Sequence, residues 1–461
     1  MEQKPEQKPK TKGWYLSLPY QMGTGLTANL PETIPDNLKG TSFIYGDDVL
    51  LQAQDWRVLL ASWWADIKPG GHLILWLPDC RYHDVKGTKV TREDILKQFA
   101  ELSDWSCLED ALIDGFIYCV LLKTPGLKYE PWRKKEKHCL IVRPGAIGDA
   151  LMATTIFDGL KAEGYAIDFY CHLNAVDAVA NDPRLERIIS TKPEHTPDNE
   201  LPIFWAAWGE RYDRVINLTN SVEGALLAQH WRSEFYWPDD QRQRIFTGSY
   251  LQSTHDIAGV AGPLKVSFYP TPEETAWAEQ KAKEIGPFIL WCLRGSAVHK
   301  WYPWAPQAIC QILSKNKDVK IILSADDGAK PLESAILDAA KEYLGDEYLF
   351  RFKSLVGTGS IRKPMTLAKY AQVVVGPETG VMNAVSFDPV KKVCLLSHSA
   401  KSNLTDDWVN VTPIVPNVPC YPCHRLHHSH DYCPQDQMTS AAICATSIAP
   451  QRLVQAVLSA L

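Results

Sequence analysis

The stretch His138-Cys-Leu-Ile-Val-Arg-Pro-Gly-Ala-Ile-Gly-Asp149 decides how the chain folds. Residues 139–142 are an apolar run typical of a buried strand, and residues 143–148 form a Gly/Pro turn. Residues 150–160 then have the apolar spacing of a helix. A strand, a glycine turn and a helix that opens with a carboxylate predict the start of a Rossmann-type half. Asp149 lies at the predicted helix start, where it either caps the helix or takes part in chemistry.

The segment Arg143-Pro-Gly-Ala-Ile-Gly-Asp-Ala-Leu-Met-Ala-Thr154 resembles the opening of the heptosyltransferase-like glycosyltransferases. Those enzymes have two Rossmann halves in the GT-B fold, invert the configuration of the sugar and need no metal. The resemblance spans roughly residues 138–460. It implies that Asp149 is the general base that takes the proton of the acceptor hydroxyl.

A second half is predicted from about residue 270, with an apolar strand over residues 288–293. The loop after it, Arg294-Gly-Ser-Ala-Val-His-Lys-Trp-Tyr-Pro303, resembles the Gly-x-Ser…Lys-x-Trp-Pro segment of the same family. A lone loop lysine is usually just solvated, so the spacing to Trp301 and Pro303 carries the interpretation. The resemblance implies that the donor phosphates are met here by Arg294, Gly295, Ser296 and Lys300.

The run Gly376-Pro-Glu-Thr-Gly-Val-Met-Asn383 follows another apolar strand. It resembles the family's Gly-x-Asp-Thr-Gly-x-x-His, which opens a helix whose N-terminus faces the donor diphosphate. The donor-binding residues that this implies are Glu378, Thr379, Gly380 and Asn383. Glu378 stands where the family has Asp, and Asn383 where it has His. The two departures leave the donor sugar open.

Three further strands are predicted in the first half, over residues 166–171, 187–189 and 212–218. The last resembles the family's Tyr-Asp-x-Val-Ile-Asp-Leu strand, and the segment after it approaches the acceptor in that family. Alternating strands and helices predict a parallel sheet, whose ligands bind beyond the carboxyl ends of the strands. Asn217 and Asn220 are therefore candidates for acceptor binding, with turn capping as the alternative.

Residues 1–12 form a polar tail expected to be disordered, and residues 13–128 a small α/β module. Its predicted helix, Lys68-Pro-Gly-Gly71 turn, buried strand 72–78 and edge strand 116–122 resemble the C-terminal half of a class I methyltransferase. No apolar strand leads into Met22-Gly-Thr-Gly25, and too few residues precede Asp47 to build the missing strands. The module is thus interpreted as a degenerate one that serves packing, dimerisation or acceptor recognition and does not bind S-adenosylmethionine.

The remaining boundaries follow from composition and periodicity. They are a linker over 129–137, an acceptor domain over 138–269, a nucleotide-sugar domain over 270–440 and a C-terminal helix over 441–461. In GT-B proteins such a terminal helix often crosses back onto the first half.

The chain has 12 cysteines, and most stand singly in apolar runs, as reduced core residues do. The loop 420–433 is different, because Cys420-x-x-Cys423 is followed by histidines and Cys433. This pattern favours close-packed reduced thiols, with a structural zinc site held by Cys420, Cys423 and Cys433 and a disulfide as the alternatives.

The 461 residues carry a net charge of −6, which gives no basic footprint for nucleic acid. No apolar run approaches membrane-spanning length and the start is no signal peptide, so a cytoplasmic protein is expected. The predicted fold class is α/β: a GT-B fold with two Rossmann-like parallel-sheet domains facing a cleft, plus the N-terminal module.

The predicted function is sugar transfer from a nucleotide-diphosphate donor to an acceptor hydroxyl, without a cofactor. The expected partners are the nucleotide sugar and an acceptor glycan, modified DNA base or protein, and the N-terminal module is a candidate for homo-oligomerisation. The alternative is a GT-B-fold scaffold that has lost catalysis.

Overall fold

The computed structural model describes residues 13–16, 41–46, 50–51, 55–83, 85, 87–100, 105–113, 115–123, 137–191, 212–219 and 221–461. The chain divides into two compact units, Met1–Lys134 and Lys135–Leu461, and each is described by itself. No helix in the described part of the chain combines the length and the apolar character needed to span a bilayer.

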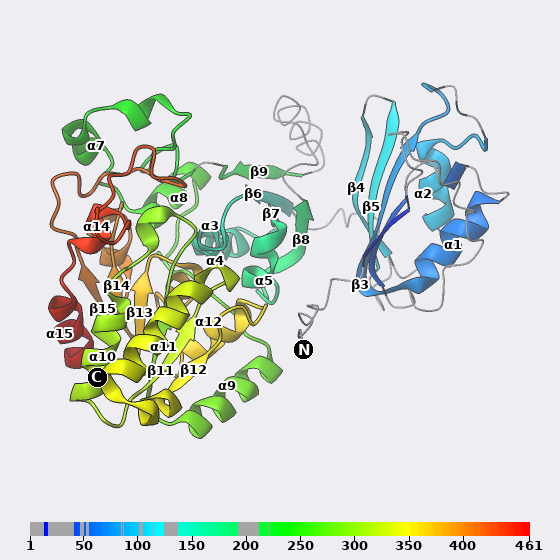
Figure 1. Ribbon diagram of the computed structural model, residues 1–461. Helices are drawn as coiled ribbons and strands as arrows, with labels where there is room; N and C mark the ends of the chain where they lie inside the picture. The colour runs from blue at the N-terminus through cyan, green and yellow to red at the C-terminus, as the bar shows by residue number, and fades with distance from the viewer. Residues whose placement is uncertain are drawn as a thin grey trace. The chain divides into compact units, whose positions relative to one another are not determined.

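The first unit contains a mixed sheet in the order β1-β2-β3-β5-β4 (Figure 1). Its strands are β1 (Gly13–Leu16), β2 (Thr41–Gly46), β3 (Ile67–Pro78), β4 (Trp105–Ile113) and β5 (Phe116–Lys123). The first three run parallel, and β5 is antiparallel to both β3 and β4. Helices α1 (Trp56–Asp66) and α2 (Arg92–Ala100) share a buried core with the sheet, which includes Trp63, Leu75 and Phe99.

Three expectations for this unit were wrong. Strands β1 and β2 precede Asp47, contrary to the expectation that too few residues lie there to build the missing strands. The Lys68–Gly71 segment is not a turn before a strand but an irregular part of β3, because the β2 register jumps from Thr41↔Ile67 to Phe43↔His72. Strand β5 is internal, since it pairs on both sides. The Met22–Gly25 run lies outside the described residues.

The first half of the second unit is a parallel sheet in the order β8-β7-β6-β9. Its strands are β6 (Lys137–Arg143), β7 (Tyr165–His172), β8 (Leu185–Thr191) and β9 (Arg214–Asn217). The helix predicted over 150–160 is divided into α3 (Ile147–Ala153), a 3-10 turn (Thr154–Ile156) and α4 (Phe157–Ala162). The hydroxyl of Thr154 donates to the carbonyl of Leu151 at 2.7 Å, and such back-bonding bends a helix.

The second half is a parallel sheet in the order β12-β11-β10-β13-β14-β15. Its strands are β10 (Phe288–Cys292), β11 (Lys320–Ser324), β12 (Phe352–Ser354), β13 (Val373–Pro377), β14 (Lys391–Leu395) and β15 (Val411–Ile414). Helices α9 (Pro272–Ile285), α12 (Arg362–Ala368) and α13 (Gly380–Ala384) pack on one face of this sheet. Helices α10 (Ala305–Lys315), α11 (Lys330–Leu344) and α15 (Pro450–Ala460) pack on the other.

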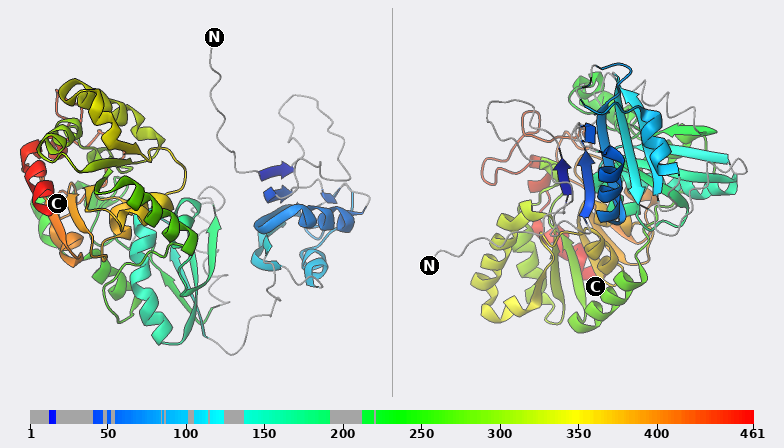
Figure 2. Two further views of the ribbon diagram at one scale, coloured as in Figure 1. Left: turned by 90° about the horizontal axis from the view of Figure 1, so that it is seen from below. Right: turned by 90° about the vertical axis from the view of Figure 1, so that its right-hand side faces the viewer.

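Helix α15 does not cross back onto the first half, contrary to the expectation from GT-B proteins. Its apolar residues Leu453, Val454 and Val457 belong to the core that the second sheet shares with α10. Figure 2 shows the same elements from two further directions.

The remaining short helices in the described chain are α5 (Val176–Val179), α7 (Asp239–Ile245), α8 (Tyr250–Ala258), α14 (Ile443–Thr446) and 3-10 turns at Leu173–Ala175, Ser233–Tyr236, Val298–Lys300, Asp327–Ala329, Asp346–Arg351, Lys401–Asn403 and Thr405–Asp407.

The two halves meet where helix α3 packs on helix α13. A Cβ atom at Gly380 would lie 2.7 Å from Cγ2 of Ile147, and one at Gly148 would lie 3.2 Å from Nδ2 of Asn383. Behind these glycines, Leu151 and other residues of α3 share one hydrophobic core with α13. The glycine motifs at the starts of the two helices, far apart in sequence, are thus in direct contact.

Gly380→Ala is expected to lower the unfolding free energy of the second unit by about 1–3 kcal/mol, because the added methyl group overpacks the stiff, β-branched Ile147. Urea denaturation of the full chain, followed by circular dichroism, measures this loss. Gly262→Ala is the control, since its Cβ would meet atoms only at 3.6 Å or more. An equal cost of Gly380→Ala in the Ile147→Ala background would contradict the proposed steric cause.

Candidate functional site

Asp149 lies in the first turn of α3, directly after the glycine that meets the second half. Its Oδ2 accepts the backbone N–H of Ala146 at 2.8 Å, so it does cap the helix. Its Oδ1 lies 3.3 Å from a guanidinium nitrogen of Arg143, and the side chain is 20% exposed. Each carboxylate oxygen can accept more than one hydrogen bond. Capping therefore leaves Asp149 able to accept a further proton.

Arg143, at the end of β6, is the buried cation that orients Asp149. Its side chain is 2% exposed, and it also bonds both carboxylate oxygens of Glu223, at 3.0 and 3.1 Å. The guanidinium thus bridges two carboxylates, which compensates its burial. Arg143, Asp149, Met152, Ser221 and Thr254 are among the residues that line a small recess beside α3.

The loop after β10 carries the predicted phosphate-binding residues. The backbone N–H of Gly295 donates to the carbonyl of Lys300 at 3.2 Å, which closes the loop on itself. The ammonium of Lys300 lies 3.7 Å from Oε2 of Glu378, and its side chain is only 16% exposed. Ser296 is exposed. Arg294 donates to the carbonyl of Gly328 at 3.1 Å and thus lies over a neighbouring turn.

The residues after β13 lie beside this loop. Thr379 caps α13, its hydroxyl accepting from the N–H of Met382 at 3.4 Å. The amide nitrogen of Asn383 donates to the carbonyl of Thr379 at 3.0 Å, and its buried Oδ1 has no hydrogen-bond partner in the structure. Helix α13 has only five residues, so its dipole is weak. Lys300, which pairs with Glu378, is the cation beside the start of this helix.

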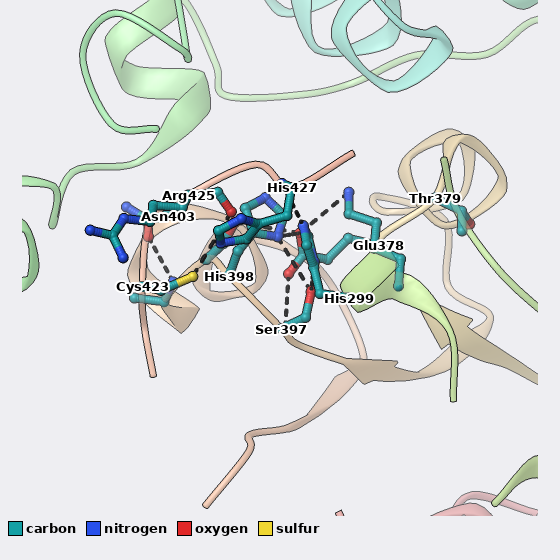
Figure 3. Close-up of polar contacts among 12 residues, drawn as sticks. His299, Glu378, Thr379, Ser397, His398, Asn403, Cys423, Arg425 and His427 are labelled. Atoms are coloured by element: carbon teal, nitrogen blue, oxygen red, sulfur yellow. Dashed lines mark hydrogen bonds and ion pairs between the residues drawn. The ribbon is translucent and has the colours of Figure 1, made fainter. Parts of the chain in front are cut away.

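Glu378 itself is buried, its side chain 5% exposed. Burial raises the pKa of its carboxyl group, and the charge of Lys300 acts in the opposite direction. The remaining contacts of Glu378 come from the loop after β14: the N–H of Ser397, the hydroxyl of Ser399 and the ring of His398 (Figure 3).

Of the two asparagines predicted to bind the acceptor, the structure describes Asn217 and not Asn220. Asn217 ends β9 and is exposed; its side-chain oxygen accepts the N–H of Thr219 at 2.9 Å, which is turn capping. Asn220 lies outside the described residues. Acceptor binding by Asn217 and Asn220 stays a prediction.

The structure does not support the structural zinc predicted at Cys420, Cys423 and Cys433. All three are free thiols, and within the described chain no group of three or more His, Cys, Asp or Glu residues is arranged to hold a metal. Burial raises the pKa of Cys423 to about 12 and that of Cys433 to about 11, which favours the thiol over the thiolate that zinc binds. The arrangement matches the interpretation of these residues as reduced thiols.

The Cys/His-rich loop has a clear packing role, because it ties the two halves together. The N–H of Ala228 in the first half donates to the carbonyl of His424 at 2.8 Å, and the N–H of Leu426 donates back to Ala228 at 3.0 Å. Arg425 adds a bond to the carbonyl of Phe235 at 2.7 Å and lies over the ring of the same residue. The loop therefore forms a second junction away from the α3–α13 contact.

Sequence reasoning missed Glu223 as the partner of Arg143, and it missed the Ser397-His398-Ser399 run. The run gave a usable signal, since three polar residues directly follow the buried strand β14 at the carboxyl edge of the sheet. Glu223 gave none, because only the fold brings it to a residue 80 positions away.

Similarity to solved structures identifies the fold of the second unit. No protein-family model matches the chain, and no curated protein matches it. Heptosyltransferase II of E. coli, an ADP-heptose LPS heptosyltransferase, is similar with a TM-score of 0.50 at 15% identity, covering 70% of this chain and 98% of that one. A glycosyl transferase family 9 protein of Veillonella parvula is similar with a TM-score of 0.50 at 12% identity, covering 70% and 97%. The second unit has the GT-B fold, as the sequence predicted.

Glu223→Ala is expected to lower the unfolding free energy by about 3 kcal/mol, the low end for breaking a buried ion pair, because Asp149 still lies near Arg143. Urea denaturation measures the loss. Glu163→Ala is the matched control: it breaks the more exposed pair with Arg214 and should cost less than about 1 kcal/mol. Equal costs would show that Arg143 does not depend on Glu223.

Proposed function

We propose that the chain is a glycosyltransferase that moves a sugar from a nucleotide-diphosphate donor to an acceptor hydroxyl, with inversion and without a catalytic metal. The observation that carries this proposal is the contact of α3 with α13. It brings the carboxylate of Asp149 and the Lys300–Glu378 region to one junction, although they belong to different halves. Sugar transfer needs a base for the acceptor hydroxyl and a cation for the departing diphosphate, and this junction offers one group of each kind.

In the proposed reaction, Asp149 accepts the proton of the acceptor hydroxyl as its oxygen attacks the anomeric carbon. The bond from that carbon to the donor diphosphate breaks, and the diphosphate leaves with the electron pair. Because attack and departure occur on opposite sides of the sugar, the configuration inverts. Arg143 acts on this step indirectly, by fixing the orientation of the carboxylate.

Lys300 is the proposed charge partner of the departing diphosphate. Its partly buried ammonium loses less of its field to solvent than an exposed lysine does. The loop of Gly295 and Ser296 and the backbone of Thr379 and Gly380 complete the proposed phosphate site, because these small residues let amide groups approach oxygen atoms closely. Arg294 is a further proposed cation of the site, one of whose N–H groups donates to the carbonyl of Gly328.

The donor class is proposed from the similar fold of an ADP-heptose enzyme together with this site. Glu378 and Asn383 stand where the related motif has Asp and His, so the sugar need not be a heptose. The acceptor is a glycan, a modified DNA base or a protein. The first unit is a candidate for acceptor recognition or self-association, and we propose a cytoplasmic location.

Asp149→Asn is expected to lower kcat at least 100-fold, the scale of a lost general base, while nucleotide binding stays unchanged. Asn keeps the acceptor oxygen for the N–H of Ala146 but cannot take a proton. Turnover with ADP-, GDP- and UDP-sugars measures the effect, and Asp346→Asn, on an exposed side chain, is the control. Undiminished turnover would sink the assignment of the base. Donor binding without turnover in the wild type would favour the scaffold alternative.

Transfer is expected to survive chelation of divalent ions, because Lys300 and backbone amides meet the diphosphate charge. Initial rates are measured within seconds of adding EDTA, before any slow loss of fold. Immediate loss of activity that Mg²⁺ or Mn²⁺ restores at once would show that a metal replaces Lys300 in this role.

A further inference from the structure

Five polar residues beside the proposed phosphate site form a closed circuit of contacts (Figure 3). They are Lys300, Glu378, His398, Ser397 and His299. Oε2 of Glu378 lies 3.7 Å from the ammonium of Lys300 and 3.2 Å from Nδ1 of His398. The side chains of Glu378 and His398 are 5% and 4% exposed. Glu378 therefore contacts the loop lysine on one side and the histidine on the other, with almost no solvent access.

The circuit continues from His398 back to the residue before Lys300. The hydroxyl oxygen of Ser397 lies 3.3 Å from Nδ1 of His398 and 2.8 Å from Nδ1 of His299. Because His299 and Lys300 are neighbours in the chain, the path returns to its start. The circuit joins the loops that follow β10, β13 and β14, so it fixes three strand ends of the second sheet relative to one another.

The hydrogen-bond direction at His299 follows from a backbone contact. Nε2 of His299 accepts the N–H of His427 at 3.4 Å, so its proton lies on Nδ1 and is donated to Ser397. Burial lowers the pKa of both His299 and His398 well below the ordinary value, so both rings are neutral. We assign the proton of the neutral His398 ring to Nδ1, because this nitrogen lies 3.2 Å from Oε2 of Glu378, which as a carboxylate oxygen only accepts hydrogen bonds.

The remaining contacts of Glu378 keep its carboxylate in place. The hydroxyl of Ser399 and the N–H of Ser397 each donate to it at 3.4 Å. Ser399 is held in turn by the hydroxyl of Tyr250, which lies 2.7 Å away on α8 of the first half. A carboxylate so surrounded has little freedom to reach a ligand itself.

We infer that His398 is a positioning residue of the donor site: its ring holds the Glu378 carboxylate, and that carboxylate holds Lys300 toward the donor diphosphate. This inference rests on the proposed function. It assigns Glu378 an indirect role, since the group that meets the phosphate is Lys300. It also assigns a role to His398, which lies outside the motifs that carry the resemblance.

The test is calorimetric binding of ADP, GDP and UDP, each compared with its monophosphate, to the full chain. His398→Leu removes the donor at nearly constant size and should weaken binding of the preferred diphosphate about tenfold, as a lost hydrogen bond to a charged group allows. Binding of the monophosphate should change little, because Lys300 acts on the second phosphate. His398→Asn places an amide nitrogen where Nδ1 lies and should restore most of the affinity.

The variant Lys300→Ala supplies the decisive comparison. In its background, His398→Leu should have no further effect on diphosphate binding, because the two residues act in series. An equal effect in both backgrounds, or equal weakening of the monophosphate, would overturn the inference and indicate a general packing role. If His398→Leu does not fold, His398→Phe gives the same test, because its ring also lacks a donor at the place of Nδ1.

Failure of the inference differs from failure of the proposed function. If Lys300→Ala weakens diphosphate binding and His398→Leu does not, the donor site stands and the role of His398 is wrong. If the wild type binds none of the three diphosphates, the donor site and this inference are both wrong.

Discussion

The close approach of helices α3 and α13 is the constraint on which the rest of the second unit depends. At the contact, Gly380 faces Ile147 and Gly148 faces Asn383: an added Cβ would clash at Gly380 and would be tightly packed at Gly148. Because each helix follows a central strand of its own sheet, the contact aligns the carboxyl edges of both sheets. Ligands of parallel sheets bind at these edges, which makes the junction the natural place for a site shared by the two halves.

Each half has a buried charged side chain at the junction that is shared between two or more partners. In the first half, the buried Arg143 is shared between Asp149 and Glu223; in the second, the buried Glu378 is shared between Lys300 and neutral donors. A buried charge persists only with such partners. Each pair leaves one member partly exposed, Asp149 and Lys300, and these are the groups proposed to act on the acceptor and the donor.

Sequence reasoning reached the fold of the second unit because its strands are continuous apolar runs followed by glycine turns, as in residues 139–148. It failed on β1, β2 and the Lys68–Gly71 segment, where pairing with a neighbouring strand overrides local turn preference. The motifs predicted that Lys300 and Glu378 belong to one site, but they did not identify the partner of either buried charge. Glu223, which bonds Arg143, has no local signal, whereas His398, which contacts Glu378, lies in a polar run directly after β14. The Cys/His loop looked like a metal site because spacing alone does not show whether thiols converge.

The central claim is that the α3–α13 junction is one active site, with its base in the first half and its phosphate-binding cation in the second. A structure of the Asp149→Asn variant with its intact nucleotide sugar tests this most directly. The account predicts the diphosphate against Lys300, and residue 149 facing the anomeric carbon on the side opposite the diphosphate. A donor bound away from Lys300, or with residue 149 on the same side as the diphosphate, would contradict it.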